Sequence, residues 1–159
     1  MEKPKITIYT DGACSMNPGP GGYGIVLISG KHRKEISEGF RKTTNNRMEL
    51  LAVITALETL KIEGSDVTVY TDSKYVSEAI NQNWLINWEK KAFKKVKNSD
   101  LWMRFLKIYP KHKVSFVWVK GHANNKENNL CDKLAVEAIS CSSLSIDKYF
   151  ENEIDITKD

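Results

Sequence analysis

The chain has 159 residues, of which 41% are hydrophobic and 28% charged, and its formal net charge is +4. This length is typical of one domain, and the composition excludes collagen, disulfide scaffolds and largely disordered proteins. The charge is uneven, because residues 147–159 hold five acids against two lysines, which leaves +7 on residues 1–146. Such a body attracts polyanions such as nucleic acid, although a solvated basic surface without a partner explains the same charge.

Two further features bear on location and thiol chemistry. Residues 1–9 lack the apolar core of a signal peptide, and no apolar run is long enough to cross a bilayer. The three cysteines are odd in number and lack Cys-x-x-Cys spacing, which argues against a disulfide framework and a zinc site. We therefore expect a cytoplasmic protein with reduced thiols and no membrane contact.

The first part of the chain predicts three strands. Residues 5–10 alternate and are rich in β-branched side chains, which favours a strand closed by Asp11-Gly12. A loop rich in glycine and proline is expected over residues 17–22. Strands are then expected over residues 23–28 and 35–40, joined by a turn at Gly30, so the pattern indicates an antiparallel meander.

The pattern changes to a helical period after Asn46. Apolar residues from Leu50 to Leu60 fall on one face, and Gly64 is expected to end the helix. The remaining pattern predicts strands over residues 67–71 and 113–119, and helices over 74–81, 84–97, 100–108 and 127–139. This order predicts an α/β fold in which helices pack on the faces of a mixed sheet, followed by a loose acidic tail from residue 142.

Acidic residues follow two similar strands of this sheet. Residues 6–11 and 67–72 have alike sequences, and each ends in an aspartate. If the strands are parallel neighbours, Asp11 and Asp72 meet at their carboxyl ends, where open α/β sheets place their sites. Glu49 stands in the first turn of the intervening helix. Because converging carboxylates call for a compensating cation and oxygen ligands select a hard ion, the pattern indicates magnesium.

Each of these acids also has a local role open to it. Asp11 could serve a turn, Glu49 could be the capping partner of Asn46, and Asp72 could cap the next helix. Asp132 could be a solvated helix residue. His122, in a loop after the last strand, is either a surface histidine or a proton shuttle beside a metal-bound phosphate.

These residues lie within segments that closely resemble the type I ribonucleases H in their bacterial form. The resemblance implies the ribonuclease H-like fold, with a five-stranded mixed sheet of three antiparallel strands followed by parallel strands, flanked by helices. It places the catalytic domain at residues 1–141 and leaves the acidic tail, residues 142–159, outside. The matching segments are Tyr9–Cys14, Asn17–Gly24, Thr43–Leu50, Tyr70–Ser73, Asp100–Trp102, Trp118–His122 and Cys131–Asp132.

The resemblance also implies an activity. The expected protein is a monomeric hydrolase, an endonuclease that cuts the RNA strand of RNA/DNA hybrids and leaves 5′-phosphate and 3′-hydroxyl ends. Two Mg²⁺ ions, for which Mn²⁺ could substitute, would be held by Asp11, Glu49, Asp72 and Asp132. His122 resembles a mobile residue that transfers a proton or assists product release.

Substrate contacts carry over in the same way. Family positions that line the minor groove of the bound hybrid correspond to Cys14, Asn17, Asn45 and Asn46. Thr44 corresponds to a family position that contacts a phosphate of the DNA strand. Trp84 and residues 90–97 resemble the basic protrusion that holds DNA phosphates.

Three positions depart from the family. Lys74 stands where many relatives carry glutamine, the protrusion is short with Phe93 in place of a frequent tryptophan, and residues 123–126 lack the usual glycine and proline.

Two other classes share this pattern in part. A non-catalytic hybrid-binding module of the same fold would lack at least one acid, yet all four are present. Another nuclease or an integrase would have a different acidic pattern, without the Asn45-Asn46 pair or the Trp118–His122 segment. A comparison of hybrid, double-stranded RNA and double-stranded DNA as substrates separates these classes.

Overall fold

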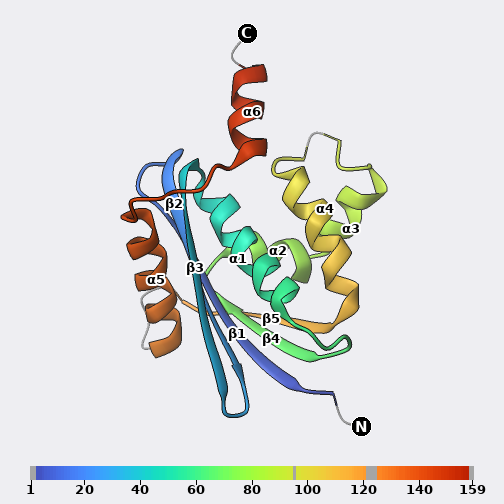
Figure 1. Ribbon diagram of the computed structural model, residues 1–159. Helices are drawn as coiled ribbons and strands as arrows, with labels where there is room; N and C mark the ends of the chain where they lie inside the picture. Colours follow the sequence, from blue (N-terminus) through green and yellow to red (C-terminus); the bar gives the residue numbers. More distant parts are fainter. Residues whose placement is uncertain (1–2, 95, 121–124, 158–159) are drawn as a thin grey trace.

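The protein forms one mixed sheet in the order β3-β2-β1-β4-β5 (Figure 1). The computed structural model describes residues 3–94, 96–120 and 125–157. β2 pairs antiparallel with β1 and β3, whereas β4 lies parallel to both β1 and β5, which confirms the predicted five-stranded mixed sheet. The strands are β1 Lys5–Cys14, β2 Gly19–Ser29, β3 His32–Thr43, β4 Asp66–Thr71 and β5 Lys113–Trp118.

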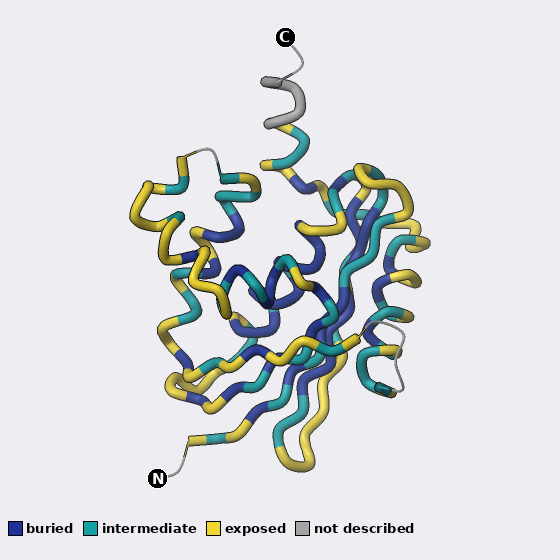
Figure 2. Tube along the Cα trace, turned by 180° about the vertical axis from the view of Figure 1, so that it is seen from behind, coloured by how far each residue is buried: buried dark blue, intermediate teal, exposed yellow. Residues whose placement is uncertain are grey.

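Helices cover both faces of the sheet, as expected for this α/β fold. The helices α1 to α4 lie on one face and α5 lies on the other (Figure 1). Buried residues follow the central strands and the facing side of α1 (Figure 2), where Ile8, Val69 and Leu57 are fully buried. None of the helices in the described ranges is long and apolar enough to cross a membrane. The helices are α1 Asn45–Thr59, α2 Lys74–Asn81, α3 Trp84–Lys90, α4 Ser99–Ile108, α5 Lys126–Ile139 and α6 Lys148–Thr157, with a short 3₁₀ helix at Tyr109–Lys111.

The first strand is longer than its sequence indicates. β1 does not close at Asp11-Gly12, because its backbone continues to pair with β2 as far as Cys14 opposite Gly21. The loop expected over residues 17–22 is correspondingly short, since β2 begins at Gly19. The turn is closed by the Ser15 amide, which donates to the Pro20 carbonyl oxygen at 2.7 Å.

The helix predicted over residues 84–97 is wrong beyond Lys90 for the described residues 91–94 and 96–97, and Lys95 lies outside the described residues. Ala92 adopts a left-handed conformation with φ 53°, and its amide donates to the Glu89 carbonyl at 3.0 Å. The Phe93 amide donates to the Trp88 carbonyl at 2.9 Å, which completes a Schellman closure of α3. Alanine occupies the position that glycine usually takes, so the sequence carries no stop signal here.

The first helix also ends earlier than expected. α1 stops at Thr59, because Leu60 is extended with φ −70° and ψ 130°. Gly64 lies five residues beyond that end and adopts φ 78° in the turn before β4. The glycine therefore marks the following turn and not the helix end.

The C-terminal segment is attached to the body and is not loose at its start. Ser145 bridges to Phe40 of β3, and Asp147 is buried. α6 then begins at Lys148. The division between a domain and a tail at residue 141 stays a prediction, but residues 145–151 contact β3, α1 and α4.

Candidate active site

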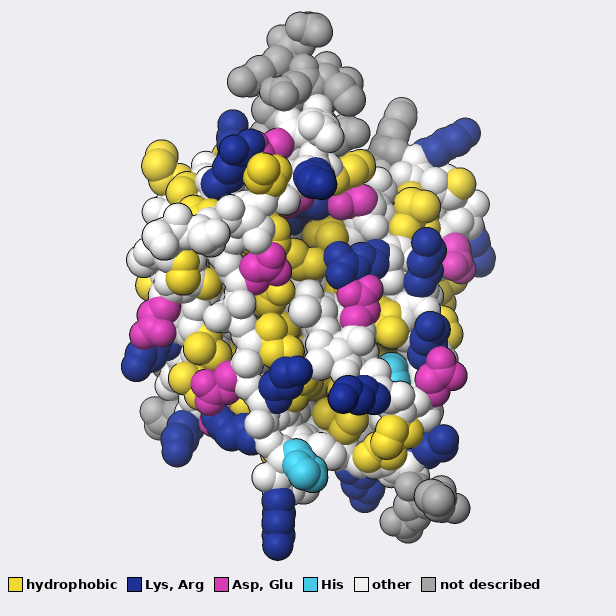
Figure 3. Space-filling view, in the orientation of Figure 1, with side chains coloured by type: hydrophobic (Ala, Val, Ile, Leu, Met, Phe, Trp, Pro, Cys, Tyr) yellow, Lys and Arg dark blue, Asp and Glu magenta, His cyan; other side chains and the backbone are white. Residues whose placement is uncertain are grey.

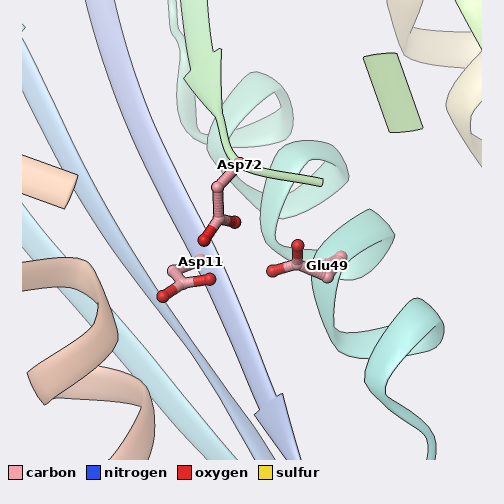
Figure 4. Close-up of side chains that lie close together, drawn as sticks. All are labelled: Asp11, Glu49 and Asp72. Carbon is pink, nitrogen blue, oxygen red and sulfur yellow. The ribbon is translucent and has the colours of Figure 1, made fainter. Parts of the chain in front are cut away.

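Parallel pairing of β1 and β4 brings the two aspartates together. Thr10 lies opposite Thr71 in the register, and the Tyr9 and Tyr70 rings stack with centroids 5.0 Å apart. Asp11 and Asp72 follow directly and point toward one another (Figure 4). Their predicted adjacency is confirmed, although only Asp72 follows the end of its strand, since β1 continues past Asp11 to Cys14.

Glu49 joins them from α1 because Gly12 allows the helix to approach β1. A Cβ atom at Gly12 would lie 2.5 Å from the Glu49 amide nitrogen and 2.7 Å from the Met48 carbonyl carbon, closer than any side chain tolerates. The Gly12 amide donates to Asp11 Oδ1 at 3.0 Å and to the Glu49 carboxylate. The Asp11-Gly12 pair is typical of a turn, so its local sequence gives no sign of this contact, which depends on the docking of α1.

The local roles open to the acids are taken by other residues. Thr44 caps α1, its hydroxyl accepting from the Arg47 amide at 3.3 Å, so Glu49 has no capping role with Asn46. Ser73 caps α2 by accepting from the Val76 amide at 3.2 Å, which leaves the Asp72 side chain to the cluster.

The three carboxylates form a tight and largely buried group. Each of Asp11, Glu49 and Asp72 offers an oxygen atom within 4.8 Å of the others. Asp11 is 8% exposed and Glu49 5% exposed. Burial, followed by the charge of Asp72, raises the pKa of Asp11 to about 8. Burial and the charges of Asp11 and Asp72 likewise raise the pKa of Glu49 well above its usual range.

This donor set fits a hard divalent cation. Two buried carboxyl groups whose pKa values are raised by burial and repulsion regain their charged forms when a cation compensates them. All ligand atoms in the group are carboxylate oxygens, which suit Mg²⁺ and similar ions better than zinc.

Asp132 lies close to this group without joining it. α5 approaches the sheet at Gly24, where a Cβ atom would lie 2.2 Å from the Cys131 carbonyl oxygen. The Cys131 thiol donates to the Tyr9 carbonyl oxygen at 3.2 Å, and Asp132 follows on the helix, half-buried. Its charge helps to raise the pKa of Asp11. All three cysteines are free thiols, as predicted.

Trp118 supports Asp72 from the end of β5. Its indole Nε1 donates to the Asp72 carbonyl oxygen at 3.0 Å. The Lys74 ammonium lies 5.1 Å from the centre of the Trp118 ring, a cation–π contact. The lysine that departs from the family therefore packs on the tryptophan that bonds the Asp72 backbone.

The predicted substrate contacts fall into two places. Asn17 Oδ1 accepts from the Asn45 amide at 3.1 Å, which joins the loop after β1 to the start of α1, near Thr44 and Asn46. The Cys14 thiol, at the end of β1, donates to the Met16 carbonyl oxygen at 2.8 Å. Trp84 is distant in sequence and begins α3, with its ring 6.5 Å from that of Trp88. His122 lies outside the described residues.

Comparison with known proteins identifies the family. The sequence model of the RNase H family matches residues 3–140. A Ribonuclease H of Rippkaea orientalis is 53% identical over 154 residues, covering 94% of each chain, and a Ribonuclease HI of Synechocystis is 49% identical over 91% of this chain and 94% of that protein. The crystal structure of LC9-RNase H1, described as a type 1 RNase H with the type 2 active-site motif, is similar with a TM-score of 0.82 at 28% identity, over 91% of this chain and 76% of that one. The crystal structure of LC11-RNase H1 in complex with RNA/DNA hybrid is similar with a TM-score of 0.60 at 29% identity. The similarity covers 85% of this chain and 96% of that one. This chain therefore belongs to the RNase H family of endonucleases.

Proposed function

We propose that this chain hydrolyses the RNA strand of RNA/DNA hybrids in a reaction that depends on divalent metal. The observation that carries the proposal is the convergence of Asp11, Glu49 and Asp72 within the part of the chain that matches the RNase H family. The similar LC11-RNase H1, solved with an RNA/DNA hybrid, supports the choice of substrate. We further propose that the protein acts as a monomer in the cytoplasm.

The proposed chemistry uses two Mg²⁺ ions, for which Mn²⁺ could substitute. Asp11, Glu49, Asp72 and Asp132 would hold them. When bound, the ions supply Lewis acidity toward the scissile phosphate and a water acidic enough to attack at neutral pH.

The chain's own groups orient and complete this site. The Gly12 amide fixes the carboxylates of Asp11 and Glu49, and the Trp118 indole fixes the backbone of Asp72. Attack on phosphorus breaks its bond to the 3′ oxygen, and His122 would deliver the proton that this oxygen requires. The products are a 5′-phosphate and a 3′-hydroxyl.

Recognition of the hybrid would use the predicted contact residues. The Asn17 to Asn45 bond holds amide groups at the start of α1, where they could reach the 2′-hydroxyl that distinguishes RNA from DNA. Sequence-independent contacts would hold the DNA strand. The proposed contact residues are Cys14, Asn17, Thr44, Asn45, Asn46 and Trp84.

A cleavage assay tests the proposal. End-labelled RNA/DNA hybrid, double-stranded RNA and double-stranded DNA of one sequence are each incubated with Mg²⁺, Mn²⁺ or EDTA. We expect cleavage of the hybrid's RNA strand with either metal and no cleavage in EDTA. Double-stranded RNA and double-stranded DNA should not be cleaved under any of these conditions. Binding of the hybrid without cleavage under every metal condition would favour the non-catalytic module.

A further inference from the structure

A cavity of about 600 Å³ lies where the C-terminal segment meets the start of α1. The base of α6 stands beside that helix and the segment that precedes α4 (Figure 1), and Lys and Arg side chains are scattered over the same face (Figure 3). The cavity joins the predicted substrate contacts to residues beyond the family match, which ends at residue 140. Its lining residues are Asn17, Thr44, Asn46, Arg47, Val96, Lys97, Asn98, Tyr149 and Phe150.

Asp147 fixes the C-terminal wall of this cavity. Its carboxylate accepts from Arg47 Nε at 2.7 Å and Nη2 at 2.9 Å, and from the Thr43 hydroxyl at 2.7 Å. It also accepts from the Phe150 amide at 3.3 Å, so the same side chain caps the first turn of α6. The chain is therefore held immediately before its two aromatic residues.

The Tyr149 ring is held from two sides. The Arg47 guanidinium lies 5.3 Å from the centre of the Tyr149 ring. The Tyr149 hydroxyl shares a 3.2 Å hydrogen bond with the Ser99 hydroxyl of α4. Glu151 is paired with Arg41 of β3 at 2.8 Å, which anchors the next turn. These contacts therefore hold the Tyr149 ring in position in the absence of a ligand.

The lining suits a nucleic-acid backbone. It combines side-chain amides with two aromatic rings, and among the described residues that line it none is acidic. Arg47 is already engaged by Asp100 and Asp147, which leaves Lys97 as the lining cation with no ion pair in the described ranges. A cation beside aromatic rings and amides is the usual combination for a phosphate and its attached sugar or base.

We propose that Tyr149 and Phe150 form part of the hybrid-binding surface, where their rings pack against one nucleotide unit of the bound hybrid. The inference rests on the proposed function and extends it to a segment beyond residues 3–140, which the family model matches. The C-terminal segment is then a component of the substrate site, and the rings contribute affinity that does not depend on charge.

Binding measurements on Tyr149→Ala and Phe150→Ala test this inference. The dissociation constant for a labelled hybrid is measured in EDTA over a range of salt, and kcat and KM are measured with Mg²⁺. We expect the dissociation constant and KM to rise about fivefold or more, with kcat retained, because an aromatic contact to a base contributes this much. In both alanine variants the slope of log affinity against log salt concentration should equal that of wild type. In Lys97→Ala this slope should be flatter, because a phosphate contact is lost.

Two further variants separate binding from folding. Asn152→Ala changes an exposed residue of α6 outside the lining, and Tyr149→Phe removes the hydroxyl bonded to Ser99 but keeps the ring. Both should bind like wild type. Wild-type affinity in both Tyr149→Ala and Phe150→Ala would overturn the inference. It would also be overturned if Tyr149→Phe lost affinity as well and the loss of affinity in each variant followed its fall in Tm. A wild-type chain that neither binds nor cuts the hybrid contradicts the proposed function instead.

Discussion

Asp11 illustrates how position changes the chemistry of an ordinary carboxyl group. Its sequence context, followed by glycine, is typical of a turn, yet it lies within β1 beside two other acids. Burial and the nearby charge of Asp72 raise its pKa to about 8. The same closeness to Asp72 and Glu49 that suits Asp11 to binding a cation therefore disfavours its ionised form in the metal-free protein.

Asp11→Asn should abolish cleavage while hybrid binding is retained. The change is nearly isosteric and removes only the charge that the ions require. Cleavage is measured with Mg²⁺, and binding is measured in EDTA, with wild type in parallel. Near-normal turnover of the variant would show that Asp11 does not hold the catalytic metal.

The stability of the metal-free protein should depend on Asp11 and pH. The pKa of Asp11 is about 8 in the folded state and about 4 in the unfolded state. Between these values the folded protein binds more protons, so its free energy of unfolding falls as pH rises.

Thermal unfolding in EDTA checks this dependence. From pH 5 to pH 8, the Tm of wild type should fall relative to that of Asp11→Asn, and the variant should be more stable at pH 8. Comparing the two proteins cancels the titrating groups that do not interact with Asp11. Parallel Tm curves would contradict the pKa shift, and Mg²⁺ added at pH 8 should raise the Tm of wild type.

At the scale of elements, the close approach of α1 to β1 assembles the site. Gly12→Ala would place a Cβ atom 2.5 Å from the Glu49 backbone nitrogen, so strand and helix must separate. We expect a lower Tm and a large loss of kcat, because Glu49 moves away from Asp11. Gly30→Ala is the matched control for kcat, since no atom lies within 4 Å of its added Cβ. Wild-type kcat in Gly12→Ala would show that the approach is not required.

The lysines Lys94 and Lys97, which follow α3, lie in turns and not on a helix. Replacement of Lys94, Lys95 and Lys97 with alanine should weaken hybrid binding and flatten its salt dependence, because fewer counterions are released. Maximum turnover should change little. The slope of log affinity against log salt should fall by up to about three, and an unchanged slope would exclude contact with phosphates.

At the scale of the whole molecule, Arg47 joins three distant parts of the chain. It lies on α1 and bonds Asp100 of α4 at 2.8 Å and Asp147 of the C-terminal segment at 2.7 Å. Asp147→Ala should lower the free energy of unfolding by about 3 kcal/mol, because it leaves a buried arginine without one partner. Denaturant unfolding measures this loss.

Glu151→Ala is the matched control for that variant. It breaks the pair with Arg41, whose side chain is 58% exposed, and exposed pairs contribute little. A loss in Asp147→Ala no larger than in Glu151→Ala would show that the C-terminal segment is not anchored by Asp147.

The sequence alone determined the order of elements from β1 to α5 and the meeting of two aspartates, whereas it gave no sign of α6. Local periodicity gave α2 at its observed bounds and α4 and β5 to within one residue, because the period of apolar residues reports which face is buried. The alike strands ending in Asp11 and Asp72 predicted their adjacency, since parallel pairing fixes neighbours at the strand ends.

Tertiary structure alone decided the features that depend on contacts between distant segments. α3 ends at a left-handed alanine without a glycine signal, β1 continues past Asp11 because β2 pairs with it, and Gly12 acts through the docking of α1. Asp147 is buried because Arg47, one hundred residues earlier in the chain, provides its partner. No local pattern encodes such partners, because burial and pairing exist only once the chain has folded.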